Sequence, residues 1–472
     1  MSFNSLEYVL FLLIVFALFW VTVRARALRT VLLLVASWIF YMSWNATFIF
    51  LIVGSTLLDY WVGLRIHASS NPRTRRAYLF LSLAGNLGAL GLFKYADFFI
   101  EAVSVALAGM GVHVEPAYLD LVLPVGISFY TFQTLSYTID IYRGRLEPTR
   151  NLVEFATFVA FFPQLVAGPI VRAREFLPQL GRRPMLDADR AGNGMFLVLR
   201  GMTKKVVIAD FLAVNYIDRV WDDPGAWSSG EVWLATAAYS WQLYYDFSGY
   251  TDIARGSAKL FGLELPENFR RPLQATSVAD FWNRWHLTLS TWMRDYVYIP
   301  LGGSRHGRGR KYFNIFVTFM VTGLWHGAGW TFLAFALWHA GTVTITHLLR
   351  DATGKNDAQT AGLSRWLLIL LNNFLFVLHW PTFRSPNLEN MLAMYERMFA
   401  MDWGAMRVAP LVWVVLLGGA AWHMTPESWG EALRAAMVRM PAAAQAAVVV
   451  VVAAVIVWVG SGQAAPFVYF QF

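Results

Sequence analysis

The sequence predicts an all-α protein that crosses a membrane many times, and three observations indicate this fold class. Of the 472 residues, 57% are hydrophobic and only 14% are charged, whereas a soluble domain carries about 25% charged residues. Apolar segments run from one end of the chain to the other with short polar gaps. Basic residues cluster in those gaps, as expected of cytoplasmic loops. We therefore predict a single transmembrane domain over residues 1–472, with about eleven to thirteen membrane helices.

Composition also excludes several classes of function. The formal net charge of +8 could indicate nucleic-acid binding, but the basic residues lie in short loops between apolar runs, so we exclude that partner and expect the lipid bilayer instead. The chain has no cysteine, which rules out disulfides, thiolate metal sites and a cysteine-bound acyl intermediate. The first apolar run ends in arginines and not in a small-residue cleavage site, so we expect it to remain as a membrane span.

The first four predicted spans establish the orientation of the chain. They cover residues 6–23, 30–44, 46–64 and 78–93. Basic groups follow the first span and the third span, so both groups lie on one side of the membrane. That side is predicted to be the cytoplasm, which places the N-terminus outside.

Two segments in the middle of the chain are unusual for helices that face lipid. Residues 121–142 carry frequent hydroxyl, amide and carboxyl side chains, which predicts a buried helix beside a water-filled or substrate-lined cavity. Residues 155–170 contain Pro163 and Gly168-Pro169. We expect a broken or re-entrant element there, with a simple kink as the alternative.

Residues 195–214 and 232–249 are two further predicted spans. In the first, Lys204 and Lys205 lie six and five residues before Asp210, respectively, which are poor spacings for a direct ion pair on an α-helix. We therefore assign these lysines to a membrane boundary. The second span ends in YYDFSGYTD, where two carboxylates, Asp246 and Asp252, are expected either to bind a ligand or to cap the following segment.

The segment from residue 255 to residue 300 is amphipathic, and it is rich in tryptophan, tyrosine and arginine. It predicts interfacial or re-entrant helices with Arg294 at the polar surface. A basic run follows, and it is expected to anchor the chain at the cytoplasmic face or to contact the phosphates of an anionic donor. This run consists of Arg305, His306, Arg308, Arg310 and Lys311. The last predicted spans cover residues 366–380, 410–422 and 443–459.

The stretch GLWHGAGW at residues 323–330 is the strongest candidate site. It places His326 near a break between two apolar segments that together are long enough to cross a bilayer twice. His326 is either a functional group or a neutral packing residue. Gly327 and Gly329 allow the backbone to bend or a ligand to approach closely. The aromatic side chains that could form the walls of a slot are Trp325 and Trp330.

The absence of several known motifs excludes the corresponding types of catalysis. The chain lacks the phosphate-binding, nucleophile-elbow and HExxH motifs. His339 and His347 are eight residues apart, roughly 12 Å along a helix, which is too far to share one metal ion, so we predict no metal site. His286 and His326 remain, both in aromatic surroundings. A neutral imidazole at either position could take a proton from an attacking hydroxyl group.

Six stretches of the chain resemble the membrane-bound O-acyltransferase family, and within it the alginate O-acetyltransferase branch. They are LPVGISFYTFQTLSYTIDIYRG, FFPQLVAGPIVRAREFLPQL, YDFSGYTDIARG, LPENFRRP, DFWNRWHLTLSTWMRDYVYIPLGGSR and GLWHGAGWTFLAFALWHA, and the terminal FVYFQF also fits. They define a motif-bearing core at about residues 121–340.

The resemblance implies a tunnel through the membrane domain, faced by His326 as the family's near-invariant histidine. It also implies His286 at the position where relatives carry a second histidine or an asparagine. On this basis we predict His326 as the catalytic base, with His286 positioning the acyl carbonyl or the acceptor. The side chains assigned to substrate or donor binding are Trp325, Trp285, Asp246, Ser248 and Arg294.

The implied function is transfer of an acetyl group from a cytoplasmic donor, acetyl-CoA, across a bacterial inner membrane, with no bound cofactor. The implied acceptor is an exopolysaccharide such as alginate, or a periplasmic partner acetyltransferase. D-alanyl or another acyl transfer to a cell-envelope polymer is the alternative within the family. A transporter or a non-catalytic scaffold is the alternative outside it, but the chain shows no inverted repeat.

Overall fold

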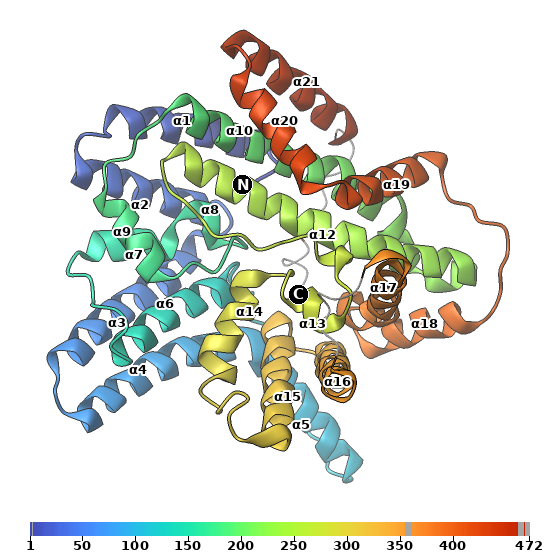
Figure 1. The fold of residues 1–472 in the computed structure, drawn as a ribbon. Coiled ribbons are helices and arrows are strands. Elements are labelled where there is room, and N and C mark those ends of the chain that lie inside the picture. Colours follow the sequence, from blue (N-terminus) through green and yellow to red (C-terminus); the bar gives the residue numbers. More distant parts are fainter. Residues whose placement is uncertain (2, 355–360, 461–466, 468–472) are drawn as a thin grey trace. The chain divides into compact units, whose positions relative to one another are not determined.

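The computed structural model describes residues 1, 3–354, 361–460 and 467. Within these residues the chain forms helices, turns and loops without a β-strand (Figure 1), so the predicted all-α class is confirmed. By backbone contacts the chain divides into two compact units, which are described separately below. The prediction of a single domain therefore stays a prediction. Of the terminal FVYFQF motif, all but Phe467 lies outside the described residues.

Unit 1 comprises Met1–Arg190 and Ser257–Pro266. Its helices are α1 (Leu6–Val21), α2 (Arg26–Met42), α3 (Ile49–Ala68), α4 (Pro72–Leu90), α5 (Ala96–Gly109), α6 (Ile127–Tyr142), α7 (Leu152–Ala160), α8 (Phe162–Leu165) and α9 (Ala173–Gly181). Each of the first four predicted spans overlaps one helix, in the order α1 to α4. The break predicted within residues 155–170 is also confirmed, because α7 ends at Ala160 and α8 restarts with Pro163 in its first turn.

Helix α6 begins later than the sequence analysis expected. The predicted span started at residue 121, but the helix starts at Ile127, after Gly126 adopts the left-handed conformation with φ 77°. Its polar side chains are buried, and two of them serve an internal hydrogen-bond network. Thr138 donates to the Asp59 carboxylate at 3.0 Å, and Thr134 lies 3.4 Å from the Asn86 side-chain oxygen. At least two polar side chains of α6 therefore form hydrogen bonds within unit 1.

Asp59, on α3, is fully buried, and hydroxyl and amide groups from other helices hydrogen-bond to it. Ser82 donates to its Oδ1, and the Asn86 amide donates to its Oδ2 at 2.8 Å. The recorded partners of this carboxylate are therefore neutral donors from α4 and α6. Such hydrogen bonds replace the water that a buried polar group loses.

Unit 2 comprises Ala191–Gly256 and Glu267–Phe472. Its longer helices are α10 (Ala188–Met202), α12 (Ser229–Leu260), α15 (Gly307–His326), α16 (Trp330–Thr353), α17 (Gly362–Arg384), α18 (Leu388–Phe399), α19 (Pro410–Met424), α20 (Glu427–Arg439) and α21 (Ala442–Gly460). The short helices α11 (Asp218–Asp222), α13 (Val278–Trp282) and α14 (Leu287–Met293) lie between them. α14 is followed by a π-helical turn, Arg294–Tyr298. The amphipathic segment is thus a series of short helices, as expected for a region too interrupted to span.

Within the described residues, four helical segments are long and apolar enough to cross a membrane. They are Ala46–Ala68, Trp330–Thr353, Gly362–Arg384 and Ala442–Val459. Helices α1 and α19 are apolar but shorter. This number is below the predicted eleven to thirteen, partly because breaks and π-helical turns divide predicted spans such as 155–170 and 195–214 into shorter pieces. The membrane character of the chain is supported, and the larger count remains a prediction.

Helices α15 and α16 pack against each other, and α16 packs in turn on α17. The break between α15 and α16 falls at Gly327–Gly329, where the sequence placed it. A Cβ atom on Gly327 would lie 1.9 Å from a carbon of the Phe332 ring. The space at Gly327 is therefore filled by Phe332 and not open to a ligand, so the glycine is needed for the close turn.

We predict that Gly327→Ala destabilises the protein by on the order of 1–3 kcal/mol, the usual cost of forcing a methyl group into a packed interior. Gly329→Ala is the matched control, because the nearest atoms to its added Cβ lie at an ordinary 3.7 Å. Thermal unfolding of the purified variants in detergent, followed by fluorescence-detected size exclusion, measures the difference. Equal midpoints for the two variants would contradict this account of the turn.

Candidate active site

His326 is the last residue of α15, and its side chain is only 3% exposed. Two phenylalanine rings meet it edge-on: Phe335 from α16 at 5.6 Å and Phe383 from α17 at 5.2 Å between centroids. The Trp325 ring lies on another side at 5.0 Å. The helix break therefore presents the imidazole inside an aromatic enclosure built by three consecutive helices.

His286 lies in the turn between α13 and α14 with a left-handed backbone, φ 42° and ψ 54°. A non-glycine residue there costs roughly 1–2 kcal/mol, so surrounding contacts must hold it. Asn268 supplies them: its carbonyl accepts from the Leu287 amide at 3.0 Å, and its side-chain oxygen accepts from the Thr288 hydroxyl at 2.7 Å. The sequence analysis missed Asn268, because only the folded turn brings it to His286.

The two candidate histidines meet through a shared aromatic neighbour. The His286 ring lies 5.8 Å from the Trp325 ring, which in turn lies 5.0 Å from His326. His286 is fully buried. It lies outside the candidate spans, and burial lowers the pKa of its imidazole to about 3, so the ring is neutral at physiological pH. The structure thus brings the rings of His286, Trp325 and His326 close together.

Trp285 packs against phenylalanine rings of the same aromatic cluster. It stacks on Phe281 at 5.3 Å and meets Phe269 at 5.0 Å. Phe269 packs on Phe247 at 5.1 Å, and Phe247 meets His286 edge-on at 4.6 Å. Trp285 is therefore a packing residue of the same aromatic cluster, and the rings of Phe269 and Phe247 connect His286 to the wall of a cavity.

This cavity has a volume of about 930 Å³ and lies in unit 2. Phe269 and Ser248 are among its lining residues, together with apolar side chains of α20 and α21. Its basic lining residues are Arg200, Lys204, Arg255, Arg270, Arg271, Arg284 and Arg434; its acidic ones are Asp252, Glu267, Asp280, Glu427 and Glu431. Basic groups are in excess, so the cavity suits an anionic ligand that also has an apolar part.

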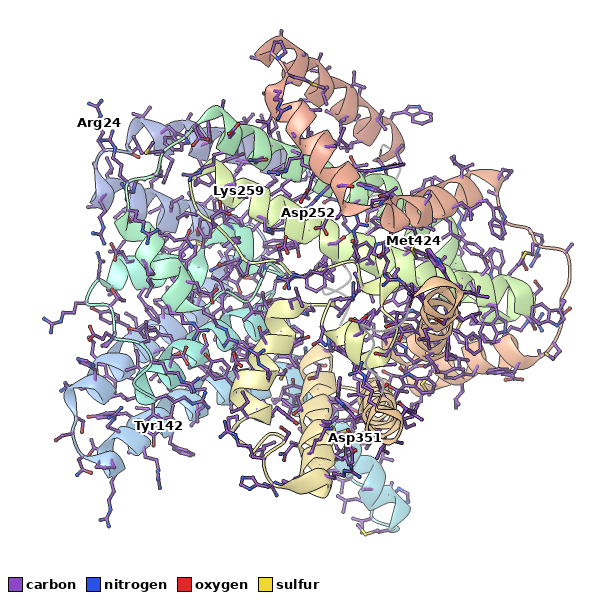
Figure 2. All side chains as sticks on the ribbon, in the orientation of Figure 1. Arg24, Tyr142, Asp252, Lys259, Asp351 and Met424 are labelled. Carbon is purple, nitrogen blue, oxygen red and sulfur yellow. The ribbon has the colours of Figure 1, made fainter. Side chains whose placement is uncertain are left out.

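Several of these basic groups are already neutralised by carboxylates. Asp252, labelled on α12 in Figure 2, accepts from Arg200 at 2.6 Å and from Lys204 at 2.7 Å. In contrast, the recorded partners of two arginines are neutral. Arg271 donates to the Thr425 carbonyl, and Arg434 donates to the Asn193 amide oxygen at 2.9 Å. These two side chains keep their full positive charge at the cavity.

Lys204 and Lys205 are buried. Their assignment to a membrane boundary stays a prediction, but the reason for it, the lack of a direct ion pair with Asp210, is wrong for Lys205. Lys205 forms ion pairs with Asp210 at 2.7 Å and with Asp246 at 2.5 Å. The Lys205–Asp210 pair was judged poor at five residues' spacing, but Thr203–Asp210 is a π-helix. Because its hydrogen bonds run from i to i+5, residues five apart lie on one face. Asp246 is thus an internal ion-pair partner and is not among the cavity's lining residues.

Other predicted residues lie away from the two histidines. Arg294 is exposed and pairs with Asp295 at 2.8 Å, and no described contact joins it to His286 or His326. In the basic run, Arg308 and Lys311 each lie 3.9 Å from Asp351. Neither they nor the rest of the run line the cavity. Trp330 is 54% exposed, so of the two predicted slot walls only Trp325 is buried beside His326.

Comparison with known proteins identifies the family of this chain. The family model described as the membrane-bound O-acyltransferase family matches residues 148–379, a range that contains both histidines. Within the described residues, no cluster of three or more histidine or carboxylate side chains could hold a metal ion.

Three relatives illustrate the range of similarity. The "Probable alginate O-acetylase AlgI" of Pseudomonas syringae pv. tomato is 42% identical over 79% of this chain and 71% of its own length. The peptidoglycan O-acetyltransferase of Helicobacter pylori is 36% identical over 78% and 73%. The teichoic acid D-alanyltransferase of Bacillus subtilis is 30% identical over 53% and 65%. With this degree of identity over most of its length, the chain belongs to the membrane-bound O-acyltransferase family and is an O-acyltransferase.

Proposed function

We propose that this protein is a membrane O-acetyltransferase that serves O-acetylation of an alginate-type exopolysaccharide. The observation that carries the proposal is the buried His286–Trp325–His326 cluster next to a cavity rich in basic groups. The relatives support the acetyl group and the acceptor class, because alginate O-acetylases match at 42% identity and a D-alanyltransferase at only 30%. Alginate is therefore preferred to a D-alanylated polymer.

The proposed donor is acetyl-CoA, taken from the cytoplasmic side. Its phosphates are anionic and its pantetheine arm is extended and less polar, which suits a cavity with arginines on one part of its lining and apolar helix residues on another. Arg271 and Arg434 carry charges that the recorded partners leave unneutralised. From the cavity wall, Phe269 and Phe247 lead to His286, so the thioester end is proposed to reach the histidine cluster.

His326 is proposed as the general base. The acceptor hydroxyl oxygen attacks the acetyl carbonyl carbon, an O–C bond forms, and the C–S bond of the thioester breaks. The hydroxyl proton passes to the imidazole, which returns it to the departing thiolate, so CoA leaves as a thiol. The end of α15 supports this role, because the C-terminal end of a helix stabilises the positive charge of the imidazolium. His286 is proposed to position the acyl carbonyl or the acceptor.

The proposed setting is the inner membrane of a bacterium, with the N-terminus in the periplasm and a tunnel between about eleven to thirteen helices. The clusters of arginines after α1 and around the α3–α4 turn support this orientation, since they lie two helices apart. The acetyl group would pass to the polysaccharide directly or through a periplasmic acetyltransferase. With no cysteine in the chain, direct transfer from donor to acceptor is the simplest route.

We predict that His326→Ala and His326→Gln each reduce acetyl transfer by at least about a hundredfold, the usual size of a general-base contribution. Purified protein in nanodiscs is given labelled acetyl-CoA, an oligomannuronate acceptor and a candidate periplasmic partner. Insertion and monodispersity of each variant serve as controls. Polymer acetylation at the wild-type level in a His326→Ala strain would exclude the imidazole from catalysis.

For His286 we predict a graded series in the same assay. His286→Asn should retain the most activity, because asparagine tolerates the left-handed backbone and can still hydrogen-bond. His286→Gly keeps the backbone relaxed but removes the ring, so it separates the loss of the imidazole from backbone strain. Activity in His286→Gly equal to that of the wild type would remove this residue from the site.

A substitution of Arg434 on α20 tests the proposed binding of acetyl-CoA in the cavity. Arg434→Gln should raise the KM for acetyl-CoA about threefold to tenfold with little change in kcat, because it removes one charged contact to the donor. Arg439→Gln is the matched control, since Arg439 is also exposed on α20 but does not line the cavity. An unchanged KM in Arg434→Gln, with a raised KM in Arg305→Gln, would place the donor phosphates on the basic run instead.

A further inference from the structure

Two histidines outside the proposed catalytic pair form a buried couple between α16 and α17. His339 Nε2 and His379 Nε2 lie 3.2 Å apart, within hydrogen-bond distance. The side chains are 1% and 0% exposed, respectively. The sequence analysis weighed His339 only against His347 as a metal ligand, and the pairing with His379 emerges only when two helices pack.

The direction of this hydrogen bond follows from a third residue. Trp282 Nε1, at the end of α13, donates to His339 Nδ1 at 3.3 Å. An indole N–H can only donate, so the neutral His339 ring carries its proton on Nε2. That proton is donated to His379 Nε2, and the proton of the neutral His379 ring is therefore on Nδ1. The hydrogen bonds therefore run in one direction, from Trp282 to His339 to His379, and this direction fixes the tautomers of both histidines.

These hydrogen-bonded residues lie next to the side chains that surround the proposed catalytic histidines. The Phe335 ring contacts His339 at 4.5 Å on one side and His326 at 5.6 Å on the other. On α17, His379 is four residues before Phe383, so both lie on one helix face, and Phe383 is the second ring against His326. On α13, Trp282 is four residues before His286. Each of the three linked residues thus shares a short segment with a wall of the site or with a site histidine.

We propose that His339 and His379 are positioning residues of the acyltransferase site. Their directional hydrogen bond, continued to Trp282, fastens α13, α16 and α17 together so that Phe335, Phe383 and the turn at His286 hold the catalytic imidazoles in place. The positioning role rests on the proposed function. The assignment of the two tautomers rests only on the hydrogen bonds and is independent of that function. Removing one member of this hydrogen-bonded series leaves its neighbour's buried donor or acceptor without a partner, which costs more than the loss of the bond itself.

Nitrogen NMR of the imidazoles tests the chain itself. Protein labelled with ¹⁵N-histidine is compared with His339→Gln and His379→Gln to assign the two rings. We expect His339 with its proton on Nε2 and His379 with its proton on Nδ1, both neutral at pH 7. The opposite tautomers, or a charged ring at either position, would overturn the proposal whether or not acetyl transfer is observed.

Kinetics test the positioning role. Trp282→Phe keeps a ring in place but removes the donor, and we expect kcat to fall on the order of tenfold, as for one lost buried partner, with the KM for acetyl-CoA within about twofold. Trp338→Phe is the matched control, because this ring also stacks near His379 at 6.3 Å but the described hydrogen bonds do not join it to the pair.

The conservative variant gives the final comparison. His379→Gln keeps an acceptor for the His339 proton and should retain more kcat than His379→Leu, which has none. Unchanged kcat in both Trp282→Phe and His379→Leu would show a hydrogen-bond chain without a positioning role and would overturn the proposal. If His379→Leu does not fold, the Trp282→Phe result decides. If wild-type protein transfers no acetyl group, the proposed function fails while the NMR result still stands.

Discussion

The close turn between α15 and α16 is the constraint on which the candidate site depends. Gly327 has no side chain, so the Phe332 ring can close over the break and the two helices can run back against each other. This turn ends α15 at His326 and places Phe335 of α16 next to it. A side chain at position 327 would push the start of α16 away from the His326 imidazole. The position of this proposed catalytic histidine therefore depends on the absence of a side chain at Gly327.

Around this turn, unit 2 separates an aromatic region from a charged one. His286 and His326 lie buried among tryptophan and phenylalanine rings. The charged side chains face the cavity on the other side of Phe269 and Phe247. Such a division suits a donor with an anionic head and a reactive end that must react away from water.

Asp59 in unit 1 and Lys205 in unit 2 are two buried polar side chains with specific partners. Asp59 receives hydroxyl and amide donors from two helices, and Lys205 lies between two aspartates. The π-helical turn at Thr203–Asp210 is what makes the second arrangement possible. An unpartnered charge in an apolar environment is costly, so only helix packings that supply such partners are stable.

The sequence by itself determined the fold class, most helix positions, the break at Gly327 and the candidacy of His286 and His326, because hydrophobic runs, glycines and local motifs are properties of neighbouring residues. Only the tertiary structure decided which distant side chains meet. It placed Trp325 between the two histidines, gave Asn268 the task of holding the His286 turn, and joined His339 to His379. It also paired Lys205 directly with Asp210, which the spacing along the chain had argued against. Such contacts depend on how separate helices pack, and no spacing along the chain encodes that directly.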